Sequence, residues 1–225
     1  MEGSRAIQAG LGLERHLDAR VIRNVLATPL EVGDDGVVLG QLTRSRRIAE
    51  MEFSFPLDRV TPLGLREVFA AYPAGQYSSR FAERLGSLGF APLRGMMRGF
   101  IDLVFEWRGR HFLIDWKSNS LGDAVESYAR GRLQEVMESR FYVLQYHLYA
   151  VALHRYLSWR IPGYSYEKDF GGAFYVFLRG VDPARGPEAG IYFDRPPVAR
   201  IEALNRLLSP EQPLLRWGAH VAHEK

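Results

Sequence analysis

Three charged side chains stand in two apolar runs, where buried strands usually carry apolar residues. The segment "GFIDLVFEWRGRHFLIDWKSN", residues 99–119, has Asp102 inside its first run and Asp115 and Lys117 at the end of its second. Two carboxylates held close together repel each other, and a divalent cation relieves that repulsion. With a lysine beside them, such a group suits phosphodiester hydrolysis, because a metal can activate water while the ammonium orients it or stabilises developing negative charge.

The segment is typical of a β-hairpin with its turn at Arg108 and Gly109. A symmetric turn of two or four residues would set Asp102 directly opposite Asp115, with Cβ atoms roughly 4.5–5.5 Å apart. Lys117 would project beside Asp115, because residues two apart on a strand share a face. A three-residue loop would shift this register, and an arginine at positive φ disfavours the two-residue turn. We expect the three charges on one face if the turn is symmetric.

The nature of the metal follows from the composition. The chain has no cysteine, which excludes disulfides, thiolate zinc sites, cysteine nucleophiles and cysteine-ligated iron–sulfur clusters. With oxygen ligands, Mg²⁺ is the expected ion and Mn²⁺ its substitute. A lone Asp-x-Lys in a strand is more often structural, so the second aspartate in register carries this hypothesis. Only three of the 29 basic residues are lysines, which makes the ammonium at Lys117 stand out.

A second group of polar side chains lies on a predicted helix, "RFYVLQYHLYAVALHRYL". Gln145 and Tyr149 are four residues apart and share a face, with Tyr146 adjacent, so an amide and phenols could point toward one spot. There they would contact a phosphate oxygen or orient the lysine. The other aromatic and histidine residues are interpreted as ordinary core or surface side chains: Tyr142, Tyr156, His147 and His154.

The elements that must position these groups indicate one α/β or α+β domain. The chain has 225 residues, 47% of them hydrophobic and 24% charged, enough for a real core. The patterns predict helices at 11–26, within 63–88, at 124–139, 140–158 and 197–208, and strands at 51–57, in the hairpin, at 171–180 and at 190–194, with a turn at 33–36. Pro56 suggests that its strand stops there or lies at an edge. The order favours a mixed β-sheet flanked by helices.

The quoted motifs resemble one known family. "GFIDLVF", "LIDWKSN", "LQYHLYAVALHRYL" and "FGGAFYVFLRG" are similar to the C-terminal nuclease domain of the RecB family, the beta subunits of exodeoxyribonuclease V, within the PD-(D/E)xK nuclease superfamily. The likeness runs over residues 41–192. The blocks Gly-x-x-Asp, Asp-x-Lys and Gln-Tyr-x-x-Tyr are specific in this order and spacing, although each alone is not.

This resemblance implies a restriction-endonuclease-like core that degrades DNA with Mg²⁺. Asp102 and Asp115 would then be the metal-binding acids, with the backbone carbonyl of Trp116 as a further ligand and Lys117 as the catalytic lysine. Gln145, Tyr146 and Tyr149 match the helix motif of the family. The resemblance also implies a role in processing double-strand ends for recombinational repair, with RecC-like and RecD-like subunits as partners. The chain itself has no G-x-x-x-x-G-K-[ST] motif for an ATP-driven motor.

One departure concerns the metal ligands. The family has a metal-binding histidine upstream, in a Gly-x-x-x-His-like setting, and His16 in "LERHLDAR" lacks that context. We therefore expect residues 1–225 to be a single nuclease domain excised from a longer subunit, with 1–40 as a helical lead-in, 41–195 as the core and 196–225 as a C-terminal helix and tail. Loss of one ligand would weaken metal affinity on the order of tens- to hundreds-fold.

DNA, rather than a membrane, is the expected partner. The net charge of +3 permits DNA binding, and six arginines flank the predicted site in sequence: Arg94, Arg98, Arg108, Arg110, Arg130 and Arg132. No apolar run reaches about 18 residues, so we expect a cytoplasmic protein. The alternatives are an inactive nuclease-like module that docks DNA or partner subunits, another PD-(D/E)xK enzyme such as a helicase-independent or CRISPR-associated nuclease, and a phosphatase or other metallohydrolase.

Overall fold

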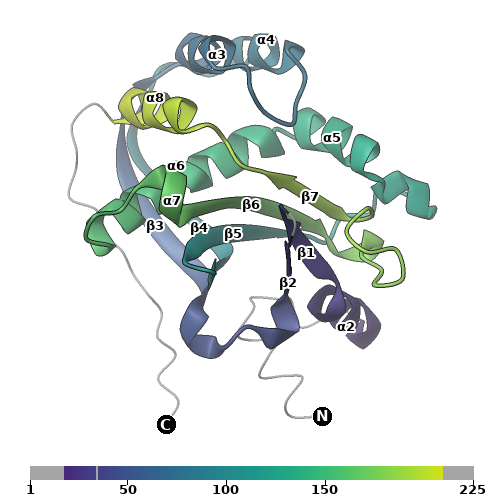
Figure 1. The fold of residues 1–225 in the computed structure, drawn as a ribbon. Helices are drawn as coiled ribbons and strands as arrows, with labels where there is room; N and C mark the ends of the chain where they lie inside the picture. Colours follow the sequence, from purple (N-terminus) through teal and green to yellow (C-terminus); the bar gives the residue numbers. More distant parts are fainter. Residues whose placement is uncertain (1–17, 34, 210–225) are drawn as a thin grey trace.

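The fold is a five-stranded mixed sheet with helices on both faces (Figure 1). The computed structural model describes residues 18–33 and 35–209. The strand order is β3-β4-β5-β6-β7, in which only β5 and β6 are parallel. The strands are β3 (Arg47–Val60), β4 (Leu93–Trp107), β5 (Arg110–Lys117), β6 (Phe170–Phe177) and β7 (Ile191–Asp194), and a separate ribbon pairs β1 (Pro29–Val32) with β2 (Asp35–Val38). This confirms the predicted architecture.

Helices connect and cover these strands. They are α2 (Ala19–Ala27), α3 (Pro62–Ala71), α4 (Arg80–Gly86), α5 (Arg130–Ser139), α6 (Tyr142–Arg160), α7 (Tyr166–Asp169) and α8 (Val198–Leu208), with 3₁₀ turns at Leu39–Gln41, Arg44–Arg46, Val125–Tyr128 and Leu178–Gly180. The predicted helix at 11–26 is confirmed over its described part, while residues 11–17 and His16 lie outside the described residues. The predicted helix at 124–139 is instead a 3₁₀ turn followed by α5, because Ala129 is extended.

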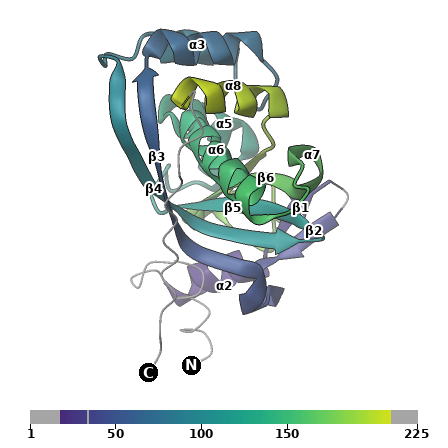
Figure 2. The same ribbon diagram turned by 90° about the vertical axis from the view of Figure 1, so that its left-hand side faces the viewer.

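The sheet separates two apolar clusters. The larger cluster lies under α3, α4, α5, α6 and α8, and the smaller one lies under α2 and the β1–β2 ribbon. Figures 1 and 2 show these two groups of elements on opposite sides of the sheet. All eight residues of β6 are buried, as a strand covered on both faces requires. Among the described residues, no helix combines the length and the apolar character needed to cross a membrane.

The β3–β4 ribbon is longer than the sequence indicated. Strand β3 runs through Pro56 to Val60 and is an edge strand, so of the two alternatives that Pro56 suggested, a stop or an edge, the edge is the one observed. A proline fits an edge strand because no neighbour needs its missing N–H. In Figure 2 the ribbon bends away from the rest of the sheet and rises beside α3 and α8. The outer half of β4 pairs only with β3, and its inner half also pairs with β5.

The hairpin between β4 and β5 has a two-residue turn, one of the two loop lengths that would set Asp102 opposite Asp115. Arg108 has φ 50° and Gly109 has φ 75°, and the register pairs Trp107 with Arg110. Glycine accepts this conformation at little cost, whereas arginine does not. The Arg108 guanidinium stacks 4.7 Å over the Trp107 ring and pairs with Asp35, which offsets its backbone strain. The symmetric register is therefore confirmed.

A buried histidine fastens α6 to α8. Nδ1 of His147 lies 2.7 Å from the Val143 carbonyl, and Nε2 lies 3.0 Å from Nη1 of Arg200. Because a guanidinium only donates, Nε2 must accept, and the ring is neutral with its proton on Nδ1. Burial first, and then the Arg200 charge, hold the pKa of His147 well below its ordinary value.

We predict that acid destabilises the fold through His147. At a pH below the ordinary histidine pKa, His147 binds a proton in the unfolded chain but not in the folded chain. The free energy of unfolding therefore decreases as the pH falls. The free energy of unfolding should drop by about 1.4 kcal/mol more between pH 7.5 and 5.5 in the wild type than in His147→Gln, measured by urea unfolding. Equal pH dependence in both proteins would contradict this assignment.

Candidate active site

The site lies where β4 separates from β5. Their ladder ends at the pair Leu103 and Ile114, so Asp102 and Asp115 occupy the next position in register. Oδ2 of Asp102 accepts the backbone N–H of Trp116 at 2.7 Å, so a carboxylate takes the place of a ladder carbonyl. The N–H and C=O of one residue point to the same side of an extended strand, so the Trp116 carbonyl also faces the Asp102 side.

Asp115 is a buried carboxylate paired with one lysine. It is 4% exposed, and its Oδ2 lies 2.6 Å from Nζ of Lys117, as the alternation along β5 predicted. The Lys117 side chain is itself only 12% exposed, so both members of this ion pair are largely removed from solvent. Burial raises the pKa of Asp115 to about 6; the Lys117 charge opposes this rise, and the Asp102 charge adds to it. A further positive charge would therefore be stabilised here.

A hydrogen-bonded chain runs from Lys117 into α6. Nζ of Lys117 donates to Oε1 of Gln145 at 3.1 Å, and Nε2 of Gln145 donates to the Tyr149 hydroxyl at 2.8 Å. The same Oε1 accepts the Tyr175 hydroxyl at 3.0 Å. The side-chain oxygen of Gln145 thus points to the lysine, and its side-chain nitrogen points to Tyr149. The predicted convergence of Gln145 and Tyr149 is confirmed, with Gln145 contacting the lysine and Tyr149 contacting Gln145.

Tyr146 does not join this group. Its hydroxyl donates to Oδ2 of Asp194 at 2.6 Å, its ring stacks on His147, and it is fully buried. The expectation that the Tyr146 hydroxyl points to the same spot as Gln145 is therefore wrong. Successive residues of a helix project about 100° apart. Tyr146 therefore points away from the direction of Gln145 and into the core.

Two aromatic residues that sequence reasoning missed surround the ammonium. Nζ of Lys117 lies 4.0 Å from the Tyr142 ring centroid and 5.0 Å from that of Tyr175. Tyr142 was interpreted as a core residue, although its spacing of three from Gln145 puts both on one helix face. Tyr175 lies beside Asp115 in the parallel ladder of β5 and β6, and no local pattern in the sequence sets the register of such a ladder.

The six arginines do not gather at the site. Arg94 and Arg98 lie on the outer part of β4, where they are exposed and pair with Asp58 and Glu52. Arg108 and Arg110 sit at the hairpin turn, roughly 20 Å along the strand from Asp102. Although both flank the predicted site in sequence, the hairpin places them at its far end. The last two are Arg130, near Glu31 and Glu188, and Arg132, paired with Glu135.

The residues present fit a hard divalent cation with few protein ligands. Their donors are carboxylate oxygens and a backbone carbonyl, which suit Mg²⁺, and burial raises the pKa of the Asp115 carboxyl, so a further cation would stabilise its charged form. Within residues 18–33 and 35–209, no group of three or more His, Asp and Glu side chains could hold a metal. Mg²⁺ commonly takes only one or two protein carboxylates, with waters and substrate phosphates completing its shell.

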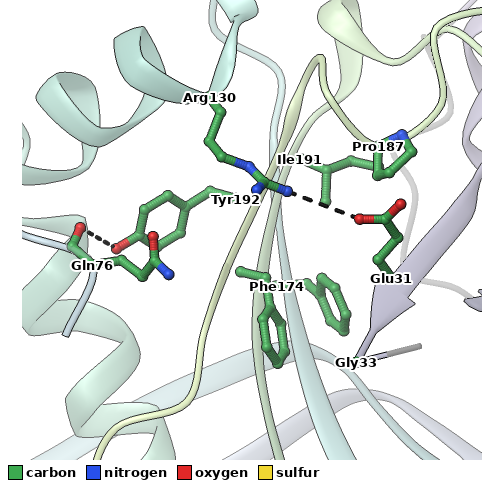
Figure 3. Close-up of a pocket in the computed structure, with 9 residues that line it drawn as sticks. Glu31, Gly33, Gln76, Arg130, Phe174, Pro187, Ile191 and Tyr192 are labelled. Carbon is green, nitrogen blue, oxygen red and sulfur yellow. Dashed lines mark hydrogen bonds and ion pairs between the residues drawn. The ribbon is translucent and has the colours of Figure 1, made fainter. Parts of the chain in front are cut away.

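A separate cavity of about 170 Å³ lies at the β7 edge of the sheet (Figure 3). Phe174 and Ile191 form part of its wall, and Arg130 reaches across it to within 4.0 Å of Glu31. None of the charged residues of the candidate site lines this cavity. This cavity is therefore a different feature from the candidate site, which lies where the β4–β5 ladder ends.

We predict strong coupling between Asp115 and Lys117 in the metal-free protein. Lys117→Met leaves a buried carboxylate without its cation and should lower the free energy of unfolding by about 3 kcal/mol. The double variant Asp115→Asn/Lys117→Met should recover most of this loss, because it buries no unpaired charge. Urea unfolding of the four proteins measures the coupling, and additive single effects would contradict it.

The chain was also compared with known proteins. No protein-family model matches it. It is similar to the RecB subunit of the RecBCD enzyme of Escherichia coli K12, with 39% identity over 188 residues, or 84% of this chain and 15% of that subunit. The Haemophilus influenzae RecB subunit is 38% identical over 82% of this chain and 14% of its own length. The Mycolicibacterium smegmatis RecB subunit is 36% identical over 83% of this chain and 19% of its own length.

These matches run through most of the chain, so they do not depend on the site motifs alone. This chain spans less than a fifth of each of these subunits, which limits the comparison to one domain. The mixed sheet flanked by helices is consistent with a restriction-endonuclease-like core. The chain belongs, as a domain-sized segment, to the RecB family.

Proposed function

We propose that this domain hydrolyses DNA phosphodiester bonds with Mg²⁺, as the nuclease part of a RecB-type subunit. The observation that carries the proposal is the pairing of Asp115 with Lys117 at 2.6 Å, beside Asp102 and Gln145, in a RecB-related chain. By analogy with RecBCD, the subunit would process double-strand ends for recombinational repair together with RecC-like and RecD-like subunits. This role on chromosomal DNA would place it in the cytoplasm.

The two carboxylates and one carbonyl would hold the cation. Asp102 and Asp115 supply the acids, and the Trp116 carbonyl faces the same opening, so the donor set is all oxygen. When bound, Mg²⁺, or Mn²⁺ in its place, supplies Lewis-acid polarisation of the phosphate and lowers the pKa of water. The raised pKa of Asp115 supports the assignment, because burial alone disfavours this carboxylate without added positive charge.

Lys117 would stabilise the charge that develops on the phosphate. Its ammonium has three N–H donors, one of which goes to Gln145 and another of which faces Asp115. The third is available to orient the attacking water or to contact a phosphate oxygen. A fixed donor in a partly buried site is preorganised for this purpose. Gln145, held by Tyr149 and Tyr175, keeps the lysine in place.

Contacts to the DNA would be mainly with phosphates. Arg94 and Arg98 are exposed on the strand that leads to Asp102, and their pairs with Asp58 and Glu52 lie at the surface, where such pairs are weak. Phosphate contacts carry no base information. We therefore expect little sequence preference in cutting.

The alternative function is a nuclease-like module that docks DNA or partner subunits without cutting. One observation favours it: the described residues hold no cluster of three or more metal-ligating side chains. A site with two acids binds metal weakly if a further ligand is missing.

Cleavage of end-labelled linear DNA tests the proposal. The purified chain should cut with Mg²⁺ or Mn²⁺ and not with EDTA, and Lys117→Ala should be slower by about 10²- to 10³-fold. If only a longer chain extended upstream cuts, the site needs a further ligand from that extension. If neither cuts, the docking module is the correct reading.

Calorimetric titration with Mn²⁺ separates the two roles. Asp115→Ala should lose measurable binding because it removes a ligand, whereas Lys117→Ala should retain it. Unchanged binding in Asp115→Ala would contradict the assignment of the metal site.

A further inference from the structure

The Lys117 ammonium lies against the faces of two tyrosines. Nζ is 4.0 Å from the Tyr142 ring centroid and 5.0 Å from the Tyr175 centroid, and the two rings are 5.7 Å apart at an angle of 37°. A cation within about 6 Å of a ring centroid is attracted by the negative face of the ring. The lysine side chain is 12% exposed, and partial burial strengthens this attraction.

The backbone places Tyr142 for this contact. Phe141 has φ 56°, and this left-handed residue turns the chain between α5 and α6. Tyr142 is the first residue of α6, three before Gln145, so the ring and the amide project from one face of the helix. The Tyr142 ring thus contacts Lys117 beside the Gln145 amide, whose oxygen accepts a hydrogen bond from the ammonium.

The polar partners of the ammonium are shared with other groups. Oε1 of Gln145 also accepts the Tyr175 hydroxyl, and Asp115 is the proposed metal ligand. A carboxylate that binds a cation attracts an ammonium less. A ring face attracts the ammonium whether or not Asp115 is occupied, and it competes for neither partner.

We propose that Tyr142 is a positioning residue for Lys117. Its ring face holds the ammonium toward the opening between β4 and β5, with Tyr175 behind it. This inference rests on the proposed nuclease function, since it assigns Tyr142 to the same reaction. Its chemical basis is the aromatic ring rather than the phenol hydroxyl.

The kinetic test compares three substitutions. Tyr142→Phe keeps the ring face and should cut DNA within about twofold of the wild type, whereas Tyr142→Leu should lower kcat on the order of tenfold with little change in KM. Tyr156→Leu is the matched control: this tyrosine is on α6, packs against Trp159 and should leave kcat unchanged. A Phe variant as slow as the Leu variant would overturn the proposal.

A spectroscopic test does not require activity or metal. The chain has three lysines, so ¹³Cε-lysine labelling gives a simple spectrum in which Lys117→Arg identifies one signal. Ring currents should move the ε-CH₂ protons of Lys117 upfield of the other two lysines. Tyr142→Phe should retain this shift, and Tyr142→Leu should lose most of it.

The two tests separate the two claims. A wild-type Lys117 signal without an upfield shift overturns the positioning role, even if Tyr142→Leu does not fold. A shifted signal that persists in folded Tyr142→Leu overturns it as well. If the upfield shift of Lys117 is present in the wild type and lost in Tyr142→Leu, but the protein does not cut DNA, the positioning role is supported and the nuclease proposal fails.

Discussion

The arrangement of the site depends on one hydrogen bond in the sheet. The Trp116 N–H donates to the Asp102 carboxylate instead of to a backbone carbonyl of β4. This bond gives the Trp116 N–H an acceptor at the point where β4 separates from β5. The two strands can therefore diverge without leaving this backbone donor unpaired. In the β3–β4 ladder, the position opposite Asp102 is Glu50, which has φ 51° and is not paired. A backbone irregularity therefore coincides with the point of divergence. The end of the ladder thus brings the Asp102 carboxylate beside the backbone of β5, an arrangement of oxygen donors that suits the proposed metal site.

The surrounding core stabilises a group of charges that is unfavourable by itself. Asp115 is buried beside a like charge, and the cation that pairs with it, Lys117, contacts aromatic rings and an amide. Removing one member of such a pair costs more than the pair contributes, because it leaves the other unpaired. Tyr146 and His147 show how α6 supports this group: both face away from the lysine and fix the helix through Asp194 and Arg200. The face of α6 that meets the lysine is thus held rigid from behind.

Local features of the sequence predicted the parts of the site that depend on short-range geometry. The turn at Arg108 determined the hairpin register, and strand alternation determined the pairing of Asp115 with Lys117. The contributions of Tyr142 and Tyr175 required tertiary information. Tyr175 reaches Asp115 through a parallel ladder joined by a long helical crossover, whose register no turn determines. Tyr142 depends on the left-handed residue before α6, and apolar periodicity does not reveal that conformation. Arg108 is the opposite case: it is near the site in sequence but lies at the far end of the hairpin in space.

Anomalous X-ray scattering from crystals of this chain grown with Mn²⁺ tests most directly whether the opening between β4 and β5 is a metal site. We predict an anomalous peak within about 2.0–2.2 Å of carboxylate oxygens of both Asp102 and Asp115, since both are hard oxygen ligands. The same peak should be absent from Asp115→Ala crystals. A peak elsewhere on the molecule, or none in the opening when the solution titration shows Mn²⁺ bound, would contradict the metal site and the nuclease mechanism built on it.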